Sequence, residues 1–241
     1  MMPEDAQAQF DSHIAQNPYP GRGLLLGHGD DGNLLLVYWI MGRSDHSRNR
    51  RFIASDTTLR TEPVDASMVK DPSLIIYEAM LELEGQQLVS NGDQTRTLYA
   101  GLQSGKTFEQ ALREREREPD APNYTPRISG LIDLRAAAPQ LFLSVIKSCQ
   151  FDPSRSQRTT FEFALPPKGL AVGLTTYMGD GSPLPSYRGE PLVLPCDGSP
   201  SEVLMRYYEA LDADNRIAVA VKQIDPAGRC LQLLVHNRYD A

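Results

Sequence analysis

The sequence predicts an α+β domain in which largely antiparallel sheets are covered by helices. Three observations lead to this prediction. Many short apolar runs lie between turn signals, few segments carry a helical period, and the segments with helix caps stand in separate blocks. A chain of this kind builds layers of sheet and helix around a hydrophobic core.

The predicted strands are short apolar runs bounded by turn residues, and many of them contain β-branched side chains. They comprise residues 24–27, 34–40, 51–54, 59–64, 87–90, 128–133, 141–148, 161–165, 170–177, 217–221 and 231–235. The dipeptide Asp31-Gly32 ends the loop between the first two runs. Asn91-Gly92, directly after another run, is typical of a hairpin turn. Residues 74–83 fit a strand or a helix, because periodicity cannot assign so short a run.

Two helices are predicted from their caps. Thr107 and Gln110 form a capping box before the charged run 109–118, whose alternating charges suit a solvated helix. Ser199 is followed by proline at the first helical position and by glutamate at N3, which opens a helix to about Leu211.

Three further segments complete the predicted organisation. Residues 95–103 favour a third helix, with a weaker pattern. Residues 179–200 are rich in glycine, proline and serine, and we expect a long loop or lid there rather than a domain linker. Residues 1–16 are interpreted as an N-terminal extension and residues 17–241 as a single domain, a length that allows a sizeable core.

Composition excludes several classes of protein. A formal net charge of −7 argues against nucleic-acid binding, although a local arginine cluster can still bind a small anion. No apolar run approaches the roughly 18–20 residues that span a bilayer. The N-terminus lacks the apolar segment of a signal peptide. We therefore expect a cytoplasmic protein whose partners are neither nucleic acid nor membrane.

Cysteines and histidines indicate no metal or cofactor site. Cys149, Cys196 and Cys230 are far apart and form no C-x-x-C pair, and the four histidines have no metal-ligand spacing. The H-E-x-x-H, G-x-S-x-G and dinucleotide-binding motifs are absent. We expect neither a metal nor a cofactor.

The segment from Gly42 to Arg51 is the strongest candidate for a binding site. It places four arginines, two serines, an asparagine and a histidine directly after an apolar run. Arginine presents paired donors that match phosphate oxygens, so the segment predicts a phosphate site. The alternative is a solvated basic loop paired with nearby acids. Arg22 follows a stretch rich in turn residues. Formation of a turn explains the prolines and glycines there, but it does not explain the arginine.

These features, in this order, resemble the stand-alone inosine monophosphate (IMP) cyclohydrolases of the archaeal type. The matching motifs are Tyr19-Pro-Gly-Arg22-Gly, Tyr38-Trp-Ile-Met-Gly-Arg43-Ser44, Ser47-Arg-Asn49-Arg50, Asp71-Pro72, Val89-Ser-Asn91-Gly92, Asn123-Tyr-Thr125-Pro126-Arg127-Ile and Thr175-Thr176-Tyr177. The resemblance implies a four-layer αββα sandwich similar to the N-terminal nucleophile hydrolases, but without their nucleophile. Residues 17–27 agree with this, since they contain no Ser, Thr or Cys.

The resemblance also implies a reaction and its catalytic residues. The reaction closes 5-formamidoimidazole-4-carboxamide ribotide to IMP with loss of water, in purine biosynthesis. Arg50 would polarise the carboxamide or formyl oxygen, Tyr77 would relay a proton, and Glu118 would act as the base. Three other acids stay open as the base: Glu114, Glu116 and Asp120. The implied substrate-binding residues are Arg22, Arg43, Ser44, Asn49, Asn91, Gly92 and Arg127.

Two other functions are left open, because a fold does not determine a function. The chain could be an amidohydrolase of the same fold that acts on another amide, or a purine-nucleotide-binding module without catalysis. For a cyclohydrolase and for a nucleotide-binding module alike, the expected partner is a small purine ribotide. Self-association into a homo-oligomer is left open as well.

Overall fold

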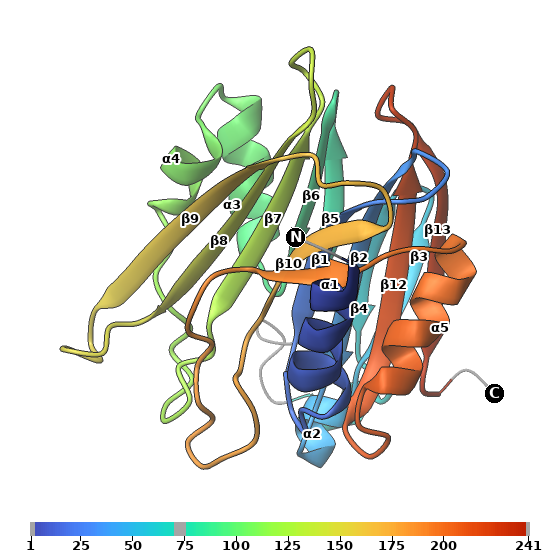
Figure 1. Ribbon diagram of the computed structural model, residues 1–241. Coiled ribbons are helices and arrows are strands. Elements are labelled where there is room, and N and C mark those ends of the chain that lie inside the picture. Colours follow the sequence, from blue (N-terminus) through green and yellow to red (C-terminus); the bar gives the residue numbers. More distant parts are fainter. Residues whose placement is uncertain (1–2, 70–75, 240–241) are drawn as a thin grey trace.

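The computed structural model describes residues 3–69 and 76–239, which form two antiparallel sheets and the helices around them (Figure 1). The six-stranded sheet has the order β11-β10-β1-β2-β12-β13. Its strands are β1 (Gly23–His28), β2 (Leu34–Met41), β10 (Leu170–Thr175), β11 (Leu192–Pro195), β12 (Arg216–Ile224) and β13 (Cys230–Asn237). The seven-stranded sheet runs in sequence order from β3 to β9. Its strands are β3 (Arg51–Ser55), β4 (Thr58–Glu62), β5 (Glu78–Leu83), β6 (Gln86–Ser90), β7 (Arg127–Asp133), β8 (Gln140–Ser148) and β9 (Ser156–Ala164).

The two sheets face each other, and helices cover their outer faces. β1 contacts β7, and β13 contacts β3, across the space between the sheets. Helices α1 (Pro3–Phe10) and α5 (Pro200–Ala210) cover the six-stranded sheet, and α3 (Gln94–Gln103) and α4 (Phe108–Leu112) cover the other (Figure 1). The short elements are a π-helical turn (Asp11–Ala15), α2 (Asp45–Arg48) and a 3₁₀ turn (Ala66–Met68). The predicted α+β sandwich is confirmed; its likeness to the N-terminal nucleophile hydrolases stays a prediction.

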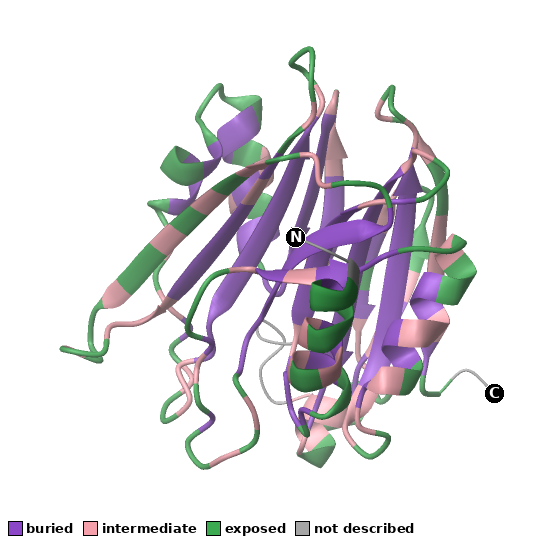
Figure 2. Cartoon of the chain, viewed as in Figure 1, coloured by how far each residue is buried: buried purple, intermediate pink, exposed green. Residues whose placement is uncertain are grey.

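Strand β2 is buried along its whole length, because both of its faces are covered (Figure 2). On one face Trp39 stacks on Tyr207 of α5, with ring centroids 5.7 Å apart. Tyr38, which points the other way, lies 5.3 Å from Phe52 of the facing sheet. A strand covered on both sides needs a continuous apolar run, and the sequence of β2 supplies one.

The predicted capping boxes at Thr107 and Ser199 are both present. Helix α5 follows its cap as predicted, and α3 and all the predicted strands are also present. The predicted helix over 109–118 is wrong, since α4 ends at Leu112. Between Leu112 and Pro119 the charged run has no apolar residue to bury, so it has no face with which to pack as a helix.

The segment 179–200 is not a loop throughout, and this prediction also needs correction. Its apolar residues form the short strand β11, which pairs with β10. Helix α1 covers β11, and the adjoining side chains of Phe10 and Ile14 are buried. The strand therefore depends on a helix from the opposite end of the chain, which local sequence does not reveal.

Asn91 and Gly92 do not turn a hairpin; they join β6 to α3, so that prediction is wrong. The reason lies in the Asn91 side chain, whose oxygen accepts hydrogen bonds from the Ile128 backbone and from Gln94. These bonds tie the junction to β7 and direct the chain into the helix. The ambiguous run 74–83 becomes β5, although residues 74 and 75 lie outside the described residues, as does the Asp71-Pro72 motif.

Lys222 of β12 fastens the two sheets together. Its side chain is fully buried, and its Nζ donates to Glu82 Oε2 at 2.8 Å and to Gln87 Oε1 at 2.6 Å. A third bond of 2.8 Å reaches the backbone oxygen of Thr57. All three partners belong to the facing sheet or its turn, so each ammonium proton is used in joining the layers.

We expect Lys222→Met to lower the free energy of unfolding by about 3 kcal/mol. Removing one member of a buried ion pair usually costs about 3–5 kcal/mol, and the partial exposure of Glu82 favours the lower end. Urea unfolding monitored by circular dichroism measures the change. Lys168→Met is the control, because Lys168 is exposed and donates only to Asp30. Equal losses in the two variants would contradict the role of Lys222.

Candidate active site

One cavity brings together several of the residues to which the sequence pointed. Its volume is about 450 Å³, and it lies where the end of β2, the following arginine-rich loop and the segments before β1, before β7 and after β10 meet. Its lining consists of Tyr19, Gly21, Arg22, Met41, Arg43, Ser44, His46, Ser47, Arg50, Asp120, Asn123, Thr125, Tyr177 and Leu184. Three of the predicted substrate-binding residues and one predicted catalytic residue are among them.

The arginine-rich loop is held by its own short helix. Ser44 caps α2, with a reciprocal capping box to Ser47. Asn49 exchanges two hydrogen bonds of 2.7 Å with the backbone of Asp65, so its amide anchors the loop rather than facing the cavity. These contacts indicate that Asn49 holds the loop in place, whereas the sequence predicted that it binds substrate.

Arg50 is buried, and main-chain oxygens orient it. Its Nε donates to the carbonyl of Ser47 at 2.8 Å, and one terminal nitrogen donates to the carbonyl of Met41 at 3.1 Å. The other terminal nitrogen bonds to none of the described residues, and Arg50 forms no ion pair with them. Burial lowers the pKa of Arg50, and the nearby positive charge of Arg22 acts in the same direction. Such a guanidinium, which faces a cavity without a counter-ion, is well suited to donate hydrogen bonds to an anion.

Arg22 is a second unpaired cation in the same cavity. Within residues 3–69 and 76–239, its guanidinium makes neither a hydrogen bond nor an ion pair, while its backbone N–H donates to Thr176 Oγ1 at 3.0 Å. The preceding Gly21 has a φ of +75°, and a Cβ there would lie 2.3 Å from Thr176 Oγ1. Only glycine fits this close turn, which directs Arg22 into the cavity.

Arg43 differs from these two arginines because it already has partners. It forms an ion pair with Asp180 and donates to the carbonyl of Gly181 at 2.9 Å. Its guanidinium also lies over the ring of Tyr19, 5.2 Å from the centroid. Arg43 therefore links the loop to the segment after β10, and an incoming anion would have to compete with Asp180 for it.

Glu118 is the buried acid of the charged run. It is only 6% exposed, and its Oε1 lies 3.0 Å from Arg127, while its buried Oε2 has no partner among the described residues. Burial raises the pKa of Glu118, and Arg127 and Arg22 oppose that rise. By contrast, Glu114 and Glu116 are exposed and paired with surface cations. The geometry thus separates Glu118 from Glu114 and Glu116, which the sequence could not do, while Asp120, the third alternative, lines the cavity itself.

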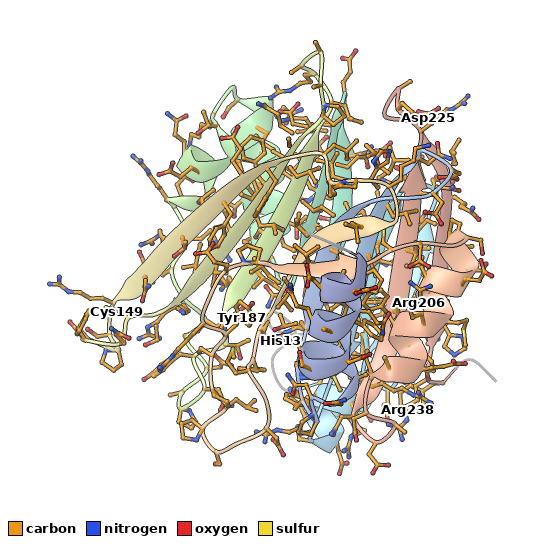
Figure 3. All side chains as sticks on the ribbon, in the orientation of Figure 1. His13, Cys149, Tyr187, Arg206, Asp225 and Arg238 are labelled. Atoms are coloured by element: carbon orange, nitrogen blue, oxygen red, sulfur yellow. The ribbon has the colours of Figure 1, made fainter. Side chains whose placement is uncertain are left out.

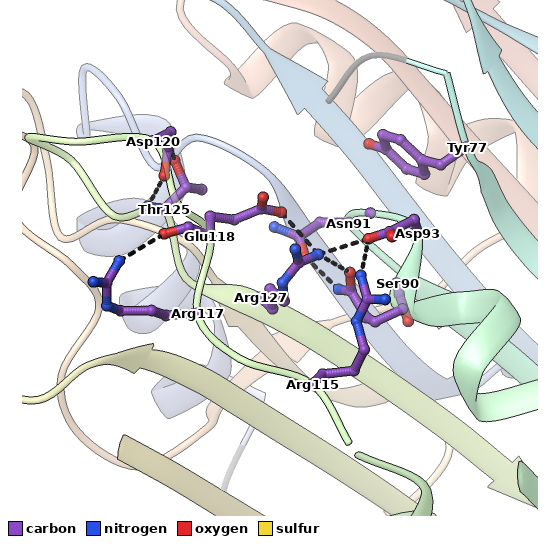
Figure 4. Close-up of polar contacts among 12 residues, drawn as sticks. Tyr77, Ser90, Asn91, Asp93, Arg115, Arg117, Glu118, Asp120, Thr125 and Arg127 are labelled. Atoms are coloured by element: carbon purple, nitrogen blue, oxygen red, sulfur yellow. Dashed lines mark hydrogen bonds and ion pairs between the residues drawn. The ribbon is translucent and has the colours of Figure 1, made fainter. Parts of the chain in front are cut away.

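Arg127, Gly92 and Asn91 support Glu118 rather than line the cavity (Figure 4). Arg127 also bonds to Asp93 at 2.8 Å, so a charged network holds the Glu118 carboxylate. A Cβ on Gly92 would lie 2.6 Å from Gln94 Oε1, which explains the small residue there, and 3.3 Å from Arg127 and 3.4 Å from Glu118 Oε1. The side-chain amide of Asn91 donates to the backbone oxygen of Pro126. Its oxygen accepts from the backbone N–H of Ile128 and from Gln94.

Tyr77 lies between the sheets, close to the cavity but not in its lining. Its hydroxyl is 2.7 Å from that of Tyr38, and both rings are buried. It is near enough to Arg22 and Arg50 to act on both electrostatically. In Figure 4 its hydroxyl points toward the side of the site that carries Glu118. The arrangement groups two tyrosine hydroxyls, two unpaired cations and one buried acid.

Sequence reasoning assigned no role to several residues that the structure brings to the cavity. Tyr19 stacks on Tyr177, with centroids 5.9 Å apart, and the Tyr177 hydroxyl bonds to Thr125. Tyr177 and Thr125 stand in matched motifs, so a signal was present. Tyr38 could not have been separated from the core aromatics of its strand.

Other chemistry-bearing side chains lie elsewhere. All three cysteines are free, none of them lines the cavity, and Figure 3 shows Cys149 near the end of β8. Burial raises the pKa of Cys196 to about 12, so its thiol is unreactive. Among the described residues, no three His, Cys, Asp or Glu side chains form a group that could hold a metal ion. Over the same residues no helix is long and apolar enough to cross a membrane.

The fold and the site together define an α+β sandwich protein with an arginine-lined cavity at the end of its central strands. A family model described as IMP cyclohydrolase-like protein matches residues 19–228, and the chain belongs to this family. A search of curated proteins finds no match to the chain. The resemblance seen in the sequence motifs is thereby confirmed.

The pH dependence of stability should reveal the burial of Glu118. Because the folded state raises the pKa of this group, its ionised form opposes folding, and that cost appears as pH rises through the folded-state pKa. Below the ordinary carboxyl pKa both states are protonated and the cost vanishes. We expect Glu118→Gln to melt above the wild type at pH 8 and level with it at pH 4, measured by circular dichroism.

Glu116→Gln is the matched control. Hydrogen bonds from Ser156 and Arg158 lower the pKa of Glu116, so its ionised form favours folding above the ordinary pKa. This variant should melt slightly below the wild type at pH 8, because the group is exposed. A fall in melting temperature for Glu118→Gln at pH 8 would show that the ionised form of Glu118 does not oppose folding.

Proposed function

We propose that the protein is an IMP cyclohydrolase, which closes 5-formamidoimidazole-4-carboxamide ribotide to IMP. The carboxamide nitrogen attacks the formyl carbon to give a carbinolamine, whose carbon–oxygen bond then breaks to release water. One observation carries the proposal: Arg22 and Arg50 face one cavity with unpaired donors, and a buried acid lies beside it. Family membership supports the same reaction class.

Arg22 suits the anionic end of this substrate, while Arg50 is assigned to the reacting end. A phosphate monoester offers several acceptor oxygens, and guanidinium groups present paired donors of matching geometry. Ser44 and Ser47 add hydroxyl groups to the same lining. Binding the distant phosphate also orients the reacting end, so this binding energy contributes to the rate.

The reacting end needs stabilisation of oxygen charge and movement of protons. Arg50 is assigned the first task, since a preorganised donor aimed at a developing oxyanion stabilises the transition state. Glu118 is assigned the role of base, because its Oε2 has no partner among the described residues and burial raises its pKa above the ordinary carboxyl value. Tyr77 is assigned the relay, and its bond to Tyr38 gives it a second hydroxyl with which to exchange protons.

The other expectations remain proposals of the same kind. We take residues 17–241 as one catalytic domain that acts in the cytoplasm on a small ribotide, without nucleic acid, membrane or cofactor, and self-association is left open. An amidohydrolase or a module that only binds nucleotide would follow from other results. Turnover of simple amides would favour the first, and binding of IMP without ring closure would favour the second.

The roles of two adjacent arginines should separate sharply. Arg50→Ala should lower kcat by on the order of 10²–10³, the usual loss when an oxyanion donor is removed. Arg51→Ala should change kcat little, because Arg51 lies on β3, half exposed, 3.6 Å from Glu62. IMP formation under substrate saturation measures both. Small, equal effects would remove Arg50 from the mechanism.

The phosphate should provide much of the substrate binding. The dephosphorylated riboside should react at least about 10²-fold more slowly in kcat/KM, since each charged hydrogen bond contributes roughly 1.5–3 kcal/mol. Arg22→Ala should slow the ribotide but not the riboside, while Arg60→Ala, on an exposed arginine paired with Glu62, should change neither. Activity should persist in EDTA. If the riboside closes as fast as the ribotide, Arg22 does not bind the phosphate.

A further inference from the structure

Tyr177, Thr125 and Asp120 form a chain of hydrogen bonds along one wall of the cavity. The Tyr177 hydroxyl lies 2.6 Å from Thr125 Oγ1, which in turn donates to Asp120 Oδ2. The backbone N–H of Thr125 donates to the other carboxylate oxygen, Oδ1, at 2.8 Å. All three residues belong to the cavity lining, and the proposed mechanism gives none of them a task.

The chain has a direction that its chemistry imposes. A carboxylate can only accept, so the Thr125 hydroxyl must donate to Asp120, and its oxygen must then accept from Tyr177. The single proton of Tyr177 is thereby committed to Thr125. Burial raises the pKa of Tyr177, against the influence of Arg22, so the phenol keeps this proton. What Tyr177 offers to the cavity is a lone pair.

Because Tyr177 offers a lone pair, the group of the ligand that bonds to it must be a hydrogen-bond donor. Phosphate oxygens and carbonyl oxygens are acceptors, so they cannot bond to Tyr177 in this state. We propose that Tyr177 accepts a hydrogen bond from an O–H or N–H group of the bound purine ribotide. Asp120 and Thr125 act as positioning residues that keep Tyr177 an acceptor. This inference rests on the proposed function.

The test compares four ligands on two proteins. Calorimetry measures binding of IMP, 2′-deoxy-IMP, 3′-deoxy-IMP and N1-methyl-IMP to the wild type and to Tyr177→Phe. One of the three donor-deleted ligands should bind the wild type about 5- to 10-fold more weakly than IMP, the usual effect of one neutral hydrogen bond. That difference should vanish in Tyr177→Phe, and the ligand concerned identifies the donor. The variant keeps the ring that stacks on Tyr19, so its fold is retained.

A second variant reverses the direction of the chain. In Asp120→Asn the Thr125 backbone N–H holds the amide oxygen in the place of Oδ1, so the amide nitrogen donates to Thr125. Thr125 must then donate to Tyr177, and Tyr177 becomes a donor into the cavity. Affinity for IMP should fall about 10-fold if the partner is the N1–H group, and should stay within about twofold if it is a ribose hydroxyl, which also accepts. Thr125→Ser keeps the hydroxyl and should match the wild type.

The outcomes separate this inference from the proposed function. If the wild type binds IMP, but Tyr177→Phe changes all four affinities by one common factor or by none, only the inference is overturned. If the wild type does not bind IMP, the proposed function is overturned and this inference falls with it. Loss of discrimination between ligands in Tyr177→Phe alone supports it, since a merely structural role would not depend on a single ligand atom.

Discussion

The burial of β2 on both of its faces is the constraint on which the site depends. Its outward side chains are covered by α5, and its inward side chains meet the facing sheet, so the strand cannot shift without opening two interfaces. The strand then supplies the site directly. Tyr38 bonds to Tyr77, and the carbonyl of Met41 at its last position holds Arg50. The cavity is therefore built at the end of a strand that is buried along its whole length.

The charges of the site are arranged against local stability. Arg22 and Arg50 are close enough to repel each other, and neither is neutralised by an ion pair within the described residues. Glu118 is buried near them, but its ion pair is with Arg127. A protein optimised only for stability would pair these groups or expose them. Unpaired buried charge facing a cavity is typical of sites that bind or transform an anionic ligand.

The sequence predicted those parts of the fold that have local causes. The caps at Thr107 and Ser199 and the apolar runs each carry their own signal, so both helix starts and the strands were located correctly, although α4 is shorter than predicted. The failures have distant causes. Strand β11 depends on cover from α1, and in the charged run after α4 both Glu116 and Glu118 pair with arginines of distant strands. In both places tertiary contacts, rather than local propensity, determine the structure.

The same distinction applies to the site. Arg50 could be singled out because its motif is local, whereas the choice among neighbouring acids could not be made. Glu118 differs from Glu116 in being buried against Arg127 and Gly92, which belong to other parts of the chain. The pairing of Thr125 with Tyr177 joins residues 52 positions apart in the chain. No pattern of spacing predicts such a contact without the sheets that create it.

The way in which Arg50 is held has a consequence for how the loop can evolve. Its guanidinium is oriented by two carbonyl groups, and backbone oxygens are present whatever side chains a residue carries. Substitutions at exposed loop positions such as Asp45 therefore leave the orienting atoms in place, provided that the short helix still forms. Divergence in this loop can accumulate around an unchanged cation. Relatives with quite different loop sequences could then share one geometry of catalysis.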